Sequence, residues 1–258
     1  MRWAVIVQTI NTLKDLKFAV EQMYGRLADF LMENVDLRRV SLVLEAGCGR
    51  GQLTLPLAER LGERCKIIAI DVSSGPYSGA LRVLAKAVRR KKLGGVIEIV
   101  KGDVRSMFDI KDESVDLVIS NEPFCELDRR GLKSALGEFH RILKRGRQMV
   151  HAELNPFSEN RAQELFIKAN SYSMETMVPR PSWFSPTADE IAVNLRRTGF
   201  TRIHVKYFET NLKLGFNLAV RQLRRWKTAP AFLSRYEKEL RKYELEYPLE
   251  HVVSCEKP

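Results

Sequence analysis

The stretch from Val43 to Gly51 constrains the fold more than any other, because an apolar segment runs directly into a glycine-rich turn. Its sequence is VLEAGCGRG, and apolar residues at helical spacing follow at once, from Leu53 to Leu61. Glycines let a backbone approach a ligand closely, and a helix start offers unpaired N–H groups to an anion. A strand, a glycine turn and a helix in this order predict a site for a nucleotide cofactor.

The spacing of the glycines indicates which cofactor this is. A dinucleotide fingerprint reads G-x-G-x-x-G/A and requires its third small residue at position 52. That position holds Gln52, and the third glycine comes one residue earlier, at Gly51. The register therefore argues against a nicotinamide-dependent oxidoreductase.

The turn instead resembles the first motif of class I S-adenosylmethionine (SAM)-dependent methyltransferases, nearest their small-molecule (UbiE/type-11-like) branch. Glu45 stands at the usual acidic position of that motif. The resemblance implies that SAM is the cofactor. It also implies that the turn contacts the cofactor through Glu45, Ala46, Gly47, Cys48, Gly49 and Gly51.

Two further strand ends carry carboxylates where the family places cofactor contacts. The buried strand 65–71 ends in Asp71, and a carboxylate there can accept hydrogen bonds from both ribose hydroxyls. A third strand is followed by Asp103, which in the family faces the adenine amino group. Val72 and Val104 come next to these carboxylates and complete the predicted cofactor contacts. The alternative is that each carboxylate is a solvated loop residue.

The resemblance continues to the end of the chain. Residues 138–147 look like the family pattern E-x-x-R-x-L-K-P-G-G, with Arg145 and Arg147 in place of Pro and Gly, and Gly146 as the expected helix cap. Short apolar strands alternate with helical patterns. The predicted fold class is α/β: a doubly wound, mostly parallel seven-stranded sheet with helices on both faces. The expected strands are 43–46, 65–71, 96–101, 115–120, 148–154, 201–208 and 251–258, and a helix is expected over 187–197.

Three segments lie outside this pattern and are expected to determine substrate choice. Residues 1–39 form a predicted N-terminal helical extension, which serves as a lid in family members and would bring Tyr24 to the cofactor. Packing on the sheet alone is the alternative. Residues 40–258 are the predicted SAM-binding methyltransferase domain, with insertions after strands five and six at about 155–185 and 210–250.

The acceptor side is predicted to follow the fourth strand, at Asn121, Glu122, Pro123 and Phe124. This N-x-P-F sequence is similar to that of methyltransferases acting on amines. There the Asn oxygen and a backbone carbonyl accept hydrogen bonds from the amine, while the aromatic ring stacks on the substrate. We expect these four residues to be catalytic and Asn121 also to contact the cofactor. Glu122 is the expected proton acceptor, with a salt-bridge partner as the alternative. Transfer to nitrogen is favoured slightly over oxygen or carbon.

Charge leaves the acceptor open. The net charge is +11, and basic residues gather in three stretches around 82–92, 141–147 and 213–235. Such surfaces can hold the phosphates of an RNA, but they can also be solvated helix faces. We therefore expect a methyltransferase acting on a small molecule, with an RNA base methyltransferase and a non-catalytic SAM-binding partner protein as alternatives.

Cysteines and histidines indicate neither a metal site nor disulfides. The four cysteines lack zinc spacing, and the four histidines are scattered, so no metal is predicted. No apolar run approaches the length of a membrane span, and a cytoplasmic protein with reduced thiols is expected. Oligomeric state is left open by the sequence.

Overall fold

A computed structural model describes residues 8–74, 78–176, 184–226 and 229–258. The chain divides into two compact units. The first combines Met1–Met23, Leu154–Ser182 and Phe208–Glu250, and the second combines Tyr24–Glu153, Trp183–Tyr207 and His251–Pro258. The predicted insertions therefore fall mostly in the first unit, and residues 177–183 of the first insertion lie outside the described residues.

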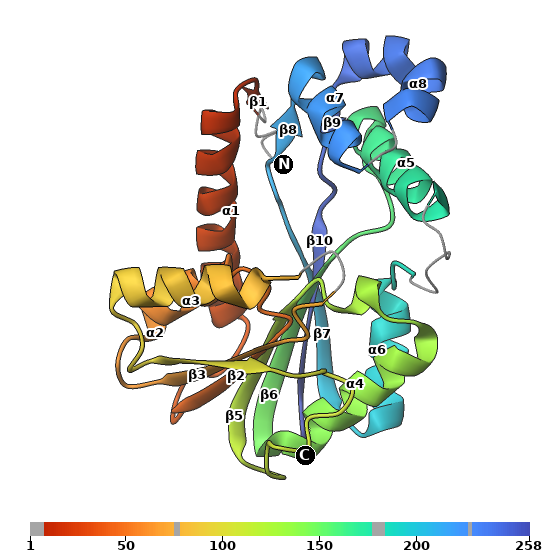
Figure 1. Ribbon diagram of the computed structural model, residues 1–258. Coiled ribbons are helices and arrows are strands. Elements are labelled where there is room, and N and C mark those ends of the chain that lie inside the picture. The colour runs from red at the N-terminus through yellow and green to blue at the C-terminus, as the bar shows by residue number, and fades with distance from the viewer. Residues whose placement is uncertain (1–7, 75–77, 177–183, 227–228) are drawn as a thin grey trace. The chain divides into compact units, whose positions relative to one another are not determined.

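The second unit is built on a seven-stranded sheet with the order β4-β3-β2-β5-β6-β10-β7 (Figure 1). The strands are β2 (Leu42–Ala46), β3 (Lys66–Asp71), β4 (Ile97–Lys101), β5 (Val115–Asn121), β6 (Leu143–Leu154), β7 (Thr201–Phe208) and β10 (Glu250–Glu256). β2 pairs in parallel with both β3 and β5, so the strand order reverses beside it. Ligands of open α/β sheets bind outside the strand ends at such a switch point. The predicted doubly wound, mostly parallel sheet is confirmed.

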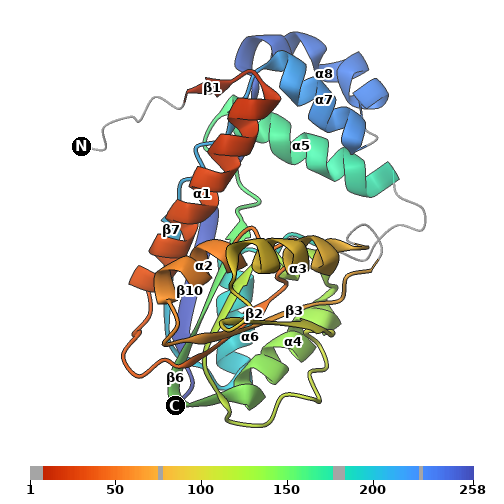
Figure 2. The same ribbon diagram turned by 60° about the vertical axis from the view of Figure 1, so that its left-hand side comes forward.

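Helices cover both faces of this sheet. Figures 1 and 2 show α2 (Thr54–Leu61) and α3 (Ala80–Lys91) on one face, with α4 (Arg129–Ile142) and α6 (Ala188–Thr198) on the other. The core between sheet and helices is apolar, and the strands that flank the switch point are buried along most of their length. The helix expected over 187–197 is confirmed as α6, which begins with a capping box from Thr187 and ends at a left-handed Gly199.

The expectation that Gly146 caps a helix is wrong. α4 ends at Ile142 and the chain enters β6 directly at Leu143, so Gly146 caps no helix. It lies inside β6 with φ at +69°, where the register against β5 shifts. Leu143 pairs with Val115 but Gln148 pairs with Leu117, so β6 carries extra residues that a left-handed glycine accommodates.

The first unit contains a small three-stranded sheet of order β1-β8-β9 and the helices of the two insertions. Its elements are β1 (Thr9–Ile10), α5 (Arg161–Thr176), β8 (Lys213–Leu214), α7 (Phe216–Arg225), α8 (Ala229–Tyr243) and β9 (Leu245–Glu246). Aromatic contacts hold the insertions together, with Phe166 4.3 Å from Tyr247 and Tyr172 5.9 Å from Phe232 between ring centroids. α1 (Leu13–Glu33) has residues in both units. No helix among the described residues is long and apolar enough to cross a membrane.

Candidate functional site

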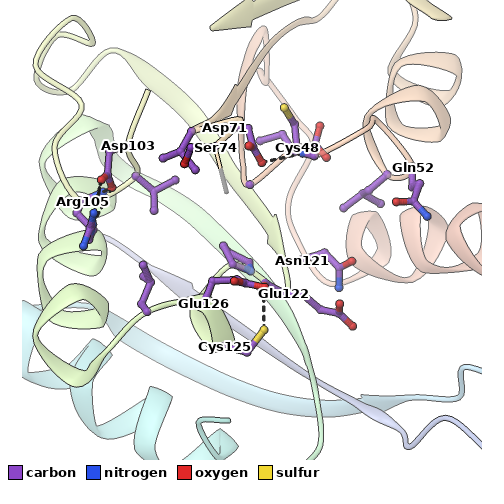
Figure 3. A pocket seen from close by; sticks show the side chains of 18 of the residues that line it. Cys48, Gln52, Asp71, Ser74, Asp103, Arg105, Asn121, Glu122, Cys125 and Glu126 are labelled. Carbon is purple, nitrogen blue, oxygen red and sulfur yellow. Dashed lines mark hydrogen bonds and ion pairs between the residues drawn. The ribbon is translucent and has the colours of Figure 1, made fainter. Parts of the chain in front are cut away.

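A cavity of about 580 Å³ lies in the second unit, at the carboxyl ends of β2, β3, β4 and β5 (Figure 3). Most of the predicted site residues line it. They are Glu45, Gly47, Cys48, Gly49, Asp71, Val72, Asp103, Val104, Asn121, Glu122 and Pro123. The strand ends therefore meet at one cavity, as the parallel topology requires. Tyr24 also lines it, as do Gln52, Leu53, Ser74, Arg105, Cys125, Glu126 and Leu127.

The glycine turn is fastened to the neighbouring strand through its backbone. The N–H groups of Gly47 and Cys48 both donate to the Ile70 carbonyl oxygen, at 2.9 and 3.1 Å. Gly47 has φ at +80°, and a Cβ there would come within 2.9 Å of Pro123 Cβ. Gly49 is also left-handed, but a Cβ on it would meet open space. The turn therefore packs tightly against Pro123 at Gly47, whereas Gly49 borders open space.

Two predicted cofactor residues do not line the cavity. Ala46 is fully buried at the end of β2. Gly51 faces α3, and a Cβ there would collide with Leu84. These two residues shape the turn from behind, and their contact with the cofactor stays a prediction.

The Asp71 carboxylate is held rigidly at the end of β3. Its Oδ2 accepts the Gly49 N–H at 3.0 Å and its Oδ1 accepts the Ser73 N–H at 2.7 Å. A carboxylate has about four lone-pair positions, so both oxygens can still accept from a ligand. Backbone hydrogen bonds therefore orient Asp71 without using all of its acceptor capacity.

Asp103 is paired with a residue that sequence reasoning missed. The Arg105 side chain donates to both Asp103 oxygens, with Nη2 to Oδ2 at 2.6 Å, and the Arg105 N–H donates to Oδ1 at 2.8 Å. These hydrogen bonds lower the pKa of Asp103. The sequence did carry a signal for this ion pair, because Arg105 stands two residues after the strand-end carboxylate. Asp103 is fixed as a carboxylate at the cavity wall.

Glu45 is buried yet incompletely bonded. It is 2% exposed, and its Oε2 has no hydrogen-bond partner among the described residues. Burial raises the pKa of Glu45 to about 7, and the charge of Asp71 adds to the rise. Buried polar atoms are nearly always bonded, so an orphaned oxygen at a cavity wall fits a hydrogen-bond donor supplied by a ligand.

The segment after β5 forms the opposite wall. Glu122 has φ at +58°, an unfavourable conformation for a non-glycine residue, and its N–H donates to the Ala152 carbonyl oxygen at 2.9 Å. The Asn121 Nδ2 donates to the same oxygen at 3.4 Å. β6 thus holds both residues at the cavity.

Phe124 differs from its predicted role. The ring is fully buried, stacks on Phe139 at 6.1 Å and lies 3.9 Å from the His151 ring, measured between centroids. It does not line the cavity. The expectation that Phe124 stacks on the substrate is therefore corrected: it anchors the segment after β5 in the core.

A buried polar chain lies behind this wall. The Ser120 hydroxyl contacts His151 Nδ1 at 2.9 Å, and His151 Nε2 lies 3.5 Å from Glu153 Oε2. The same Glu153 oxygen accepts the Cys125 N–H at 3.2 Å. Sequence reasoning missed Glu153, although its position two residues after His151 on one strand was a signal that both share a face.

Burial governs the charges of these groups. It lowers the pKa of His151 to about 3, so the ring is neutral. It raises the pKa of Glu122 to about 8, and the nearby charges of Glu153 and Glu126 add to the rise. The Cys125 thiol has a pKa raised well above its usual value by burial, and its Sγ donates to the Glu122 carbonyl oxygen at 3.1 Å. A packed thiol therefore describes Cys125 better than a nucleophile.

Comparisons with known proteins agree with this geometry. Residues 43–146 match the family model described as a methyltransferase domain. Two curated relatives are tRNA1(Val) (adenine(37)-N6)-methyltransferases, each 26% identical to this chain. The Haemophilus influenzae protein aligns over 35% of this chain and 38% of its own length, and the Photorhabdus laumondii protein over 55% and 58%. The alignments thus span less than two thirds of these relatives.

Solved structures share the fold. A geranyl diphosphate methyltransferase in complex with SAM superposes with a TM-score of 0.59 at 13% identity, covering 91% of this chain and 85% of that one. Residues 43–146 thus match a methyltransferase domain, and the chain shares the fold of this methyltransferase structure. The glycine register predicts SAM, which is the ligand of that structure.

Proposed function

We propose that this protein is an enzyme that transfers the methyl group of SAM to an amine nitrogen of a small molecule. The observation that carries the proposal is the single cavity that joins the glycine turn and Asp71 to the Asn121–Pro123 segment. The first set fits a cofactor and the second fits an acceptor. Resemblance to the small-molecule branch of the family supports the choice of acceptor size.

The cofactor half of the cavity fits SAM. Asp71 would accept from the ribose hydroxyls, Asp103 and the Val104 N–H would contact the adenine, and Gly49 leaves open space beside the turn. The orphaned Glu45 oxygen would accept from a donor of the methionine portion. Tyr24 would reach the same portion from the N-terminal extension, residues 1–39, acting as a lid. When bound, SAM supplies an electrophilic methyl group on a sulfonium.

The acceptor half orients the nucleophile. Asn121 and a backbone carbonyl would accept hydrogen bonds from the amine, while the ring of Pro123 supports the wall. Glu122 would take the proton that the nitrogen loses. Holding two reactants in near-attack geometry can lower a barrier by about 7–11 kcal/mol, so positioning is the larger part of this catalysis.

The cofactor assignment predicts a clear binding preference. Calorimetry should detect binding of SAM and S-adenosylhomocysteine, and no binding of NAD or NADP, because Gln52 stands where a dinucleotide turn needs a small residue. Preferential binding of a nicotinamide dinucleotide would contradict the proposal. Binding of SAM without methyl transfer to any fraction of a cell extract would favour the non-catalytic alternative.

RNA is the second acceptor that specific observations support. Both curated relatives are named as tRNA adenine methyltransferases. Arg221, Arg224 and Arg225 are exposed on α7 and form no ion pair with another described residue. On α3, Lys91 pairs with Glu59, but Arg89 and the other basic residues of that face form no described ion pair.

Charge reversal separates the two acceptors. If α7 tracks a phosphate backbone, RNA affinity should fall with salt with a log–log slope of about −0.7 per contacted phosphate on a single strand. Replacing Arg221, Arg224 and Arg225 by Glu should then abolish RNA binding without changing SAM affinity. We expect instead that the triple variant keeps its methyl transfer to small amines and shows no RNA phenotype. A salt-sensitive RNA complex lost in the variant would overturn that expectation.

A further inference from the structure

Three buried polar side chains lie behind the cavity wall that follows β5. Ser120 and His151 are 0% exposed and Glu153 is 1% exposed, and none of them lines the cavity. Ser120 on β5 pairs with His151 on β6, which explains the 2.9 Å contact between the Ser120 Oγ and the His151 Nδ1. Glu153 is two residues further along β6 on the same face, and its Oε2 lies 3.5 Å from the His151 Nε2.

This buried polar chain reaches the cavity wall through Glu153. The Glu153 Oε2 accepts the Cys125 N–H at 3.2 Å, and Cys125 lines the cavity. The Cys125 Sγ donates in turn to the Glu122 carbonyl oxygen at 3.1 Å (Figure 3). His151 also contacts the same segment directly, because its ring lies 3.9 Å from the Phe124 ring between centroids. The chain therefore holds the residues after β5 from behind at two points.

Core packing alone does not explain these residues. Burying a polar group costs free energy unless it is hydrogen-bonded, whereas an apolar side chain of similar size needs no partner. The neighbouring core residues Phe124 and Phe139 are apolar. A polar chain at this place is therefore expected to serve the wall to which it is bonded.

The contacts of His151 assign the proton on its ring. Burial lowers the pKa of His151 to about 3, so the ring is neutral and only one of its nitrogens carries a proton. Its Nε2 makes no hydrogen bond within the described residues, but it lies within ion-pair distance of Glu153. That Glu153 oxygen already accepts the Cys125 N–H, so it attracts Nε2 as an N–H and repels it as a lone pair. The bare Nδ1 then accepts from the Ser120 hydroxyl.

We infer that His151 is a positioning residue for the acceptor wall. The acceptor wall is the part of the cavity wall formed by Asn121, Glu122, Pro123 and Cys125. Ser120 orients the His151 ring, and the Nε2–H keeps the Glu153 carboxyl group in place. Glu153 in turn fixes Cys125, so His151 acts through these residues and touches neither substrate nor cofactor. This inference rests on the proposed function, in which the acceptor wall orients the methyl acceptor.

Two substitutions of His151 separate positioning from core packing. Glutamine can place an N–H donor where Nε2 lies, whereas leucine fills similar space without a donor. His151→Leu should slow methyl transfer from labelled SAM into the low-molecular-mass fraction of a cell extract about 10- to 100-fold, the effect of losing a hydrogen bond to a charged group. His151→Gln should keep most of the transfer. His251→Leu is the matched control: it removes a buried histidine of β10 whose ring nitrogens make no hydrogen bond within the described residues, and it should change nothing.

Two further measurements follow the same contacts without an acceptor. NMR of the nitrogen-labelled, unmodified protein should show the ring proton of His151 on Nε2. Amide hydrogen exchange at Cys125 should be about tenfold or more faster in His151→Leu, because the acceptor of that N–H is no longer held in place, and nearly unchanged in His151→Gln. Calorimetry should give the same SAM affinity in all of these proteins, because His151 does not line the cavity.

Different failures have different meanings. A ring proton on Nδ1 of His151 would overturn the inference. So would a leucine variant that transfers methyl groups as fast as the unmodified protein, because apolar packing would then suffice. If His151→Leu does not fold, Ser120→Ala takes its place, since it removes only the hydroxyl that orients the ring: slower transfer supports the inference and unchanged transfer overturns it.

The proposed function fails in a different way. Absence of SAM binding and of methyl transfer by the unmodified protein would overturn it. The tautomer of His151 and the exchange rate at Cys125 would still decide whether His151 holds the wall.

Discussion

Replacing Glu122 by glutamine should lower the rate of methyl transfer by about 10²–10⁴-fold, the usual contribution of a general base. Glutamine has nearly the same shape but cannot take a proton from the acceptor nitrogen. SAM affinity should change little, because Glu122 lies on the acceptor wall. Single-turnover transfer from labelled SAM measures the rate, and calorimetry measures cofactor binding. A variant with unchanged transfer would make Glu122 a structural residue.

The pH dependence of kcat/KM, measured for the unmodified protein and for Glu122→Gln, gives an independent check. Burial raises the pKa of Glu122 to about 8, and the charges of Glu153 and Glu126 add to this. Below that pH the carboxyl is protonated and cannot accept a proton, so kcat/KM should rise as the pH rises through about 8. Among its neighbours, His151 stays neutral over this range, and the Cys125 thiol titrates higher. If the rise in kcat/KM is absent in Glu122→Gln, it comes from titration of the Glu122 carboxyl and not from titration of the amine substrate.

The sheet and most of the residues that line the cavity could be predicted from sequence, because each lies at the end of a strand. Each strand is a short apolar run, and the residue that lines the cavity lies at its carboxyl end, as Asp71 follows Ile70. Once the strands are parallel, their carboxyl ends meet at one edge without any further information. Asp71 and Asn121 therefore line the same cavity although they lie far apart in the sequence.

The buried polar chain of Ser120, His151 and Glu153 could not be predicted, because it depends on the register between β5 and β6. Ser120 meets His151 since β5 and β6 pair at those positions, and the left-handed Gly146 contributes to the local irregularity of that pairing. No spacing in the sequence reports such a shift. Phe124 fits an amine-methyltransferase motif, yet its ring turns into the core against Phe139. A four-residue motif specifies residue types but not the direction in which each side chain points.

Asp71→Ala is expected to remove most of the affinity for SAM. If the carboxylate accepts two ribose hydroxyls at about 1.5–3 kcal/mol each, the dissociation constant should rise by about 10²–10⁴-fold. The carboxylate also accepts the N–H groups of Gly49 and Ser73, so the turn loses support in the same variant. Calorimetry with SAM measures the loss, and thermal unfolding shows how much of it comes from the turn.

Two matched variants separate these contributions. Asp71→Asn keeps one carbonyl oxygen and removes the charge, so it should hold part of the turn and recover only part of the SAM affinity. Glu98→Ala removes an exposed carboxylate on β4 that does not line the cavity, and should leave SAM affinity unchanged. If Asp71→Ala binds SAM as the unmodified protein does, Asp71 only fastens the turn to β3, and the ribose must be held elsewhere. If Asp71→Ala loses more SAM affinity than Asp71→Asn does, and the two variants unfold at similar temperatures, Asp71 contacts the cofactor directly.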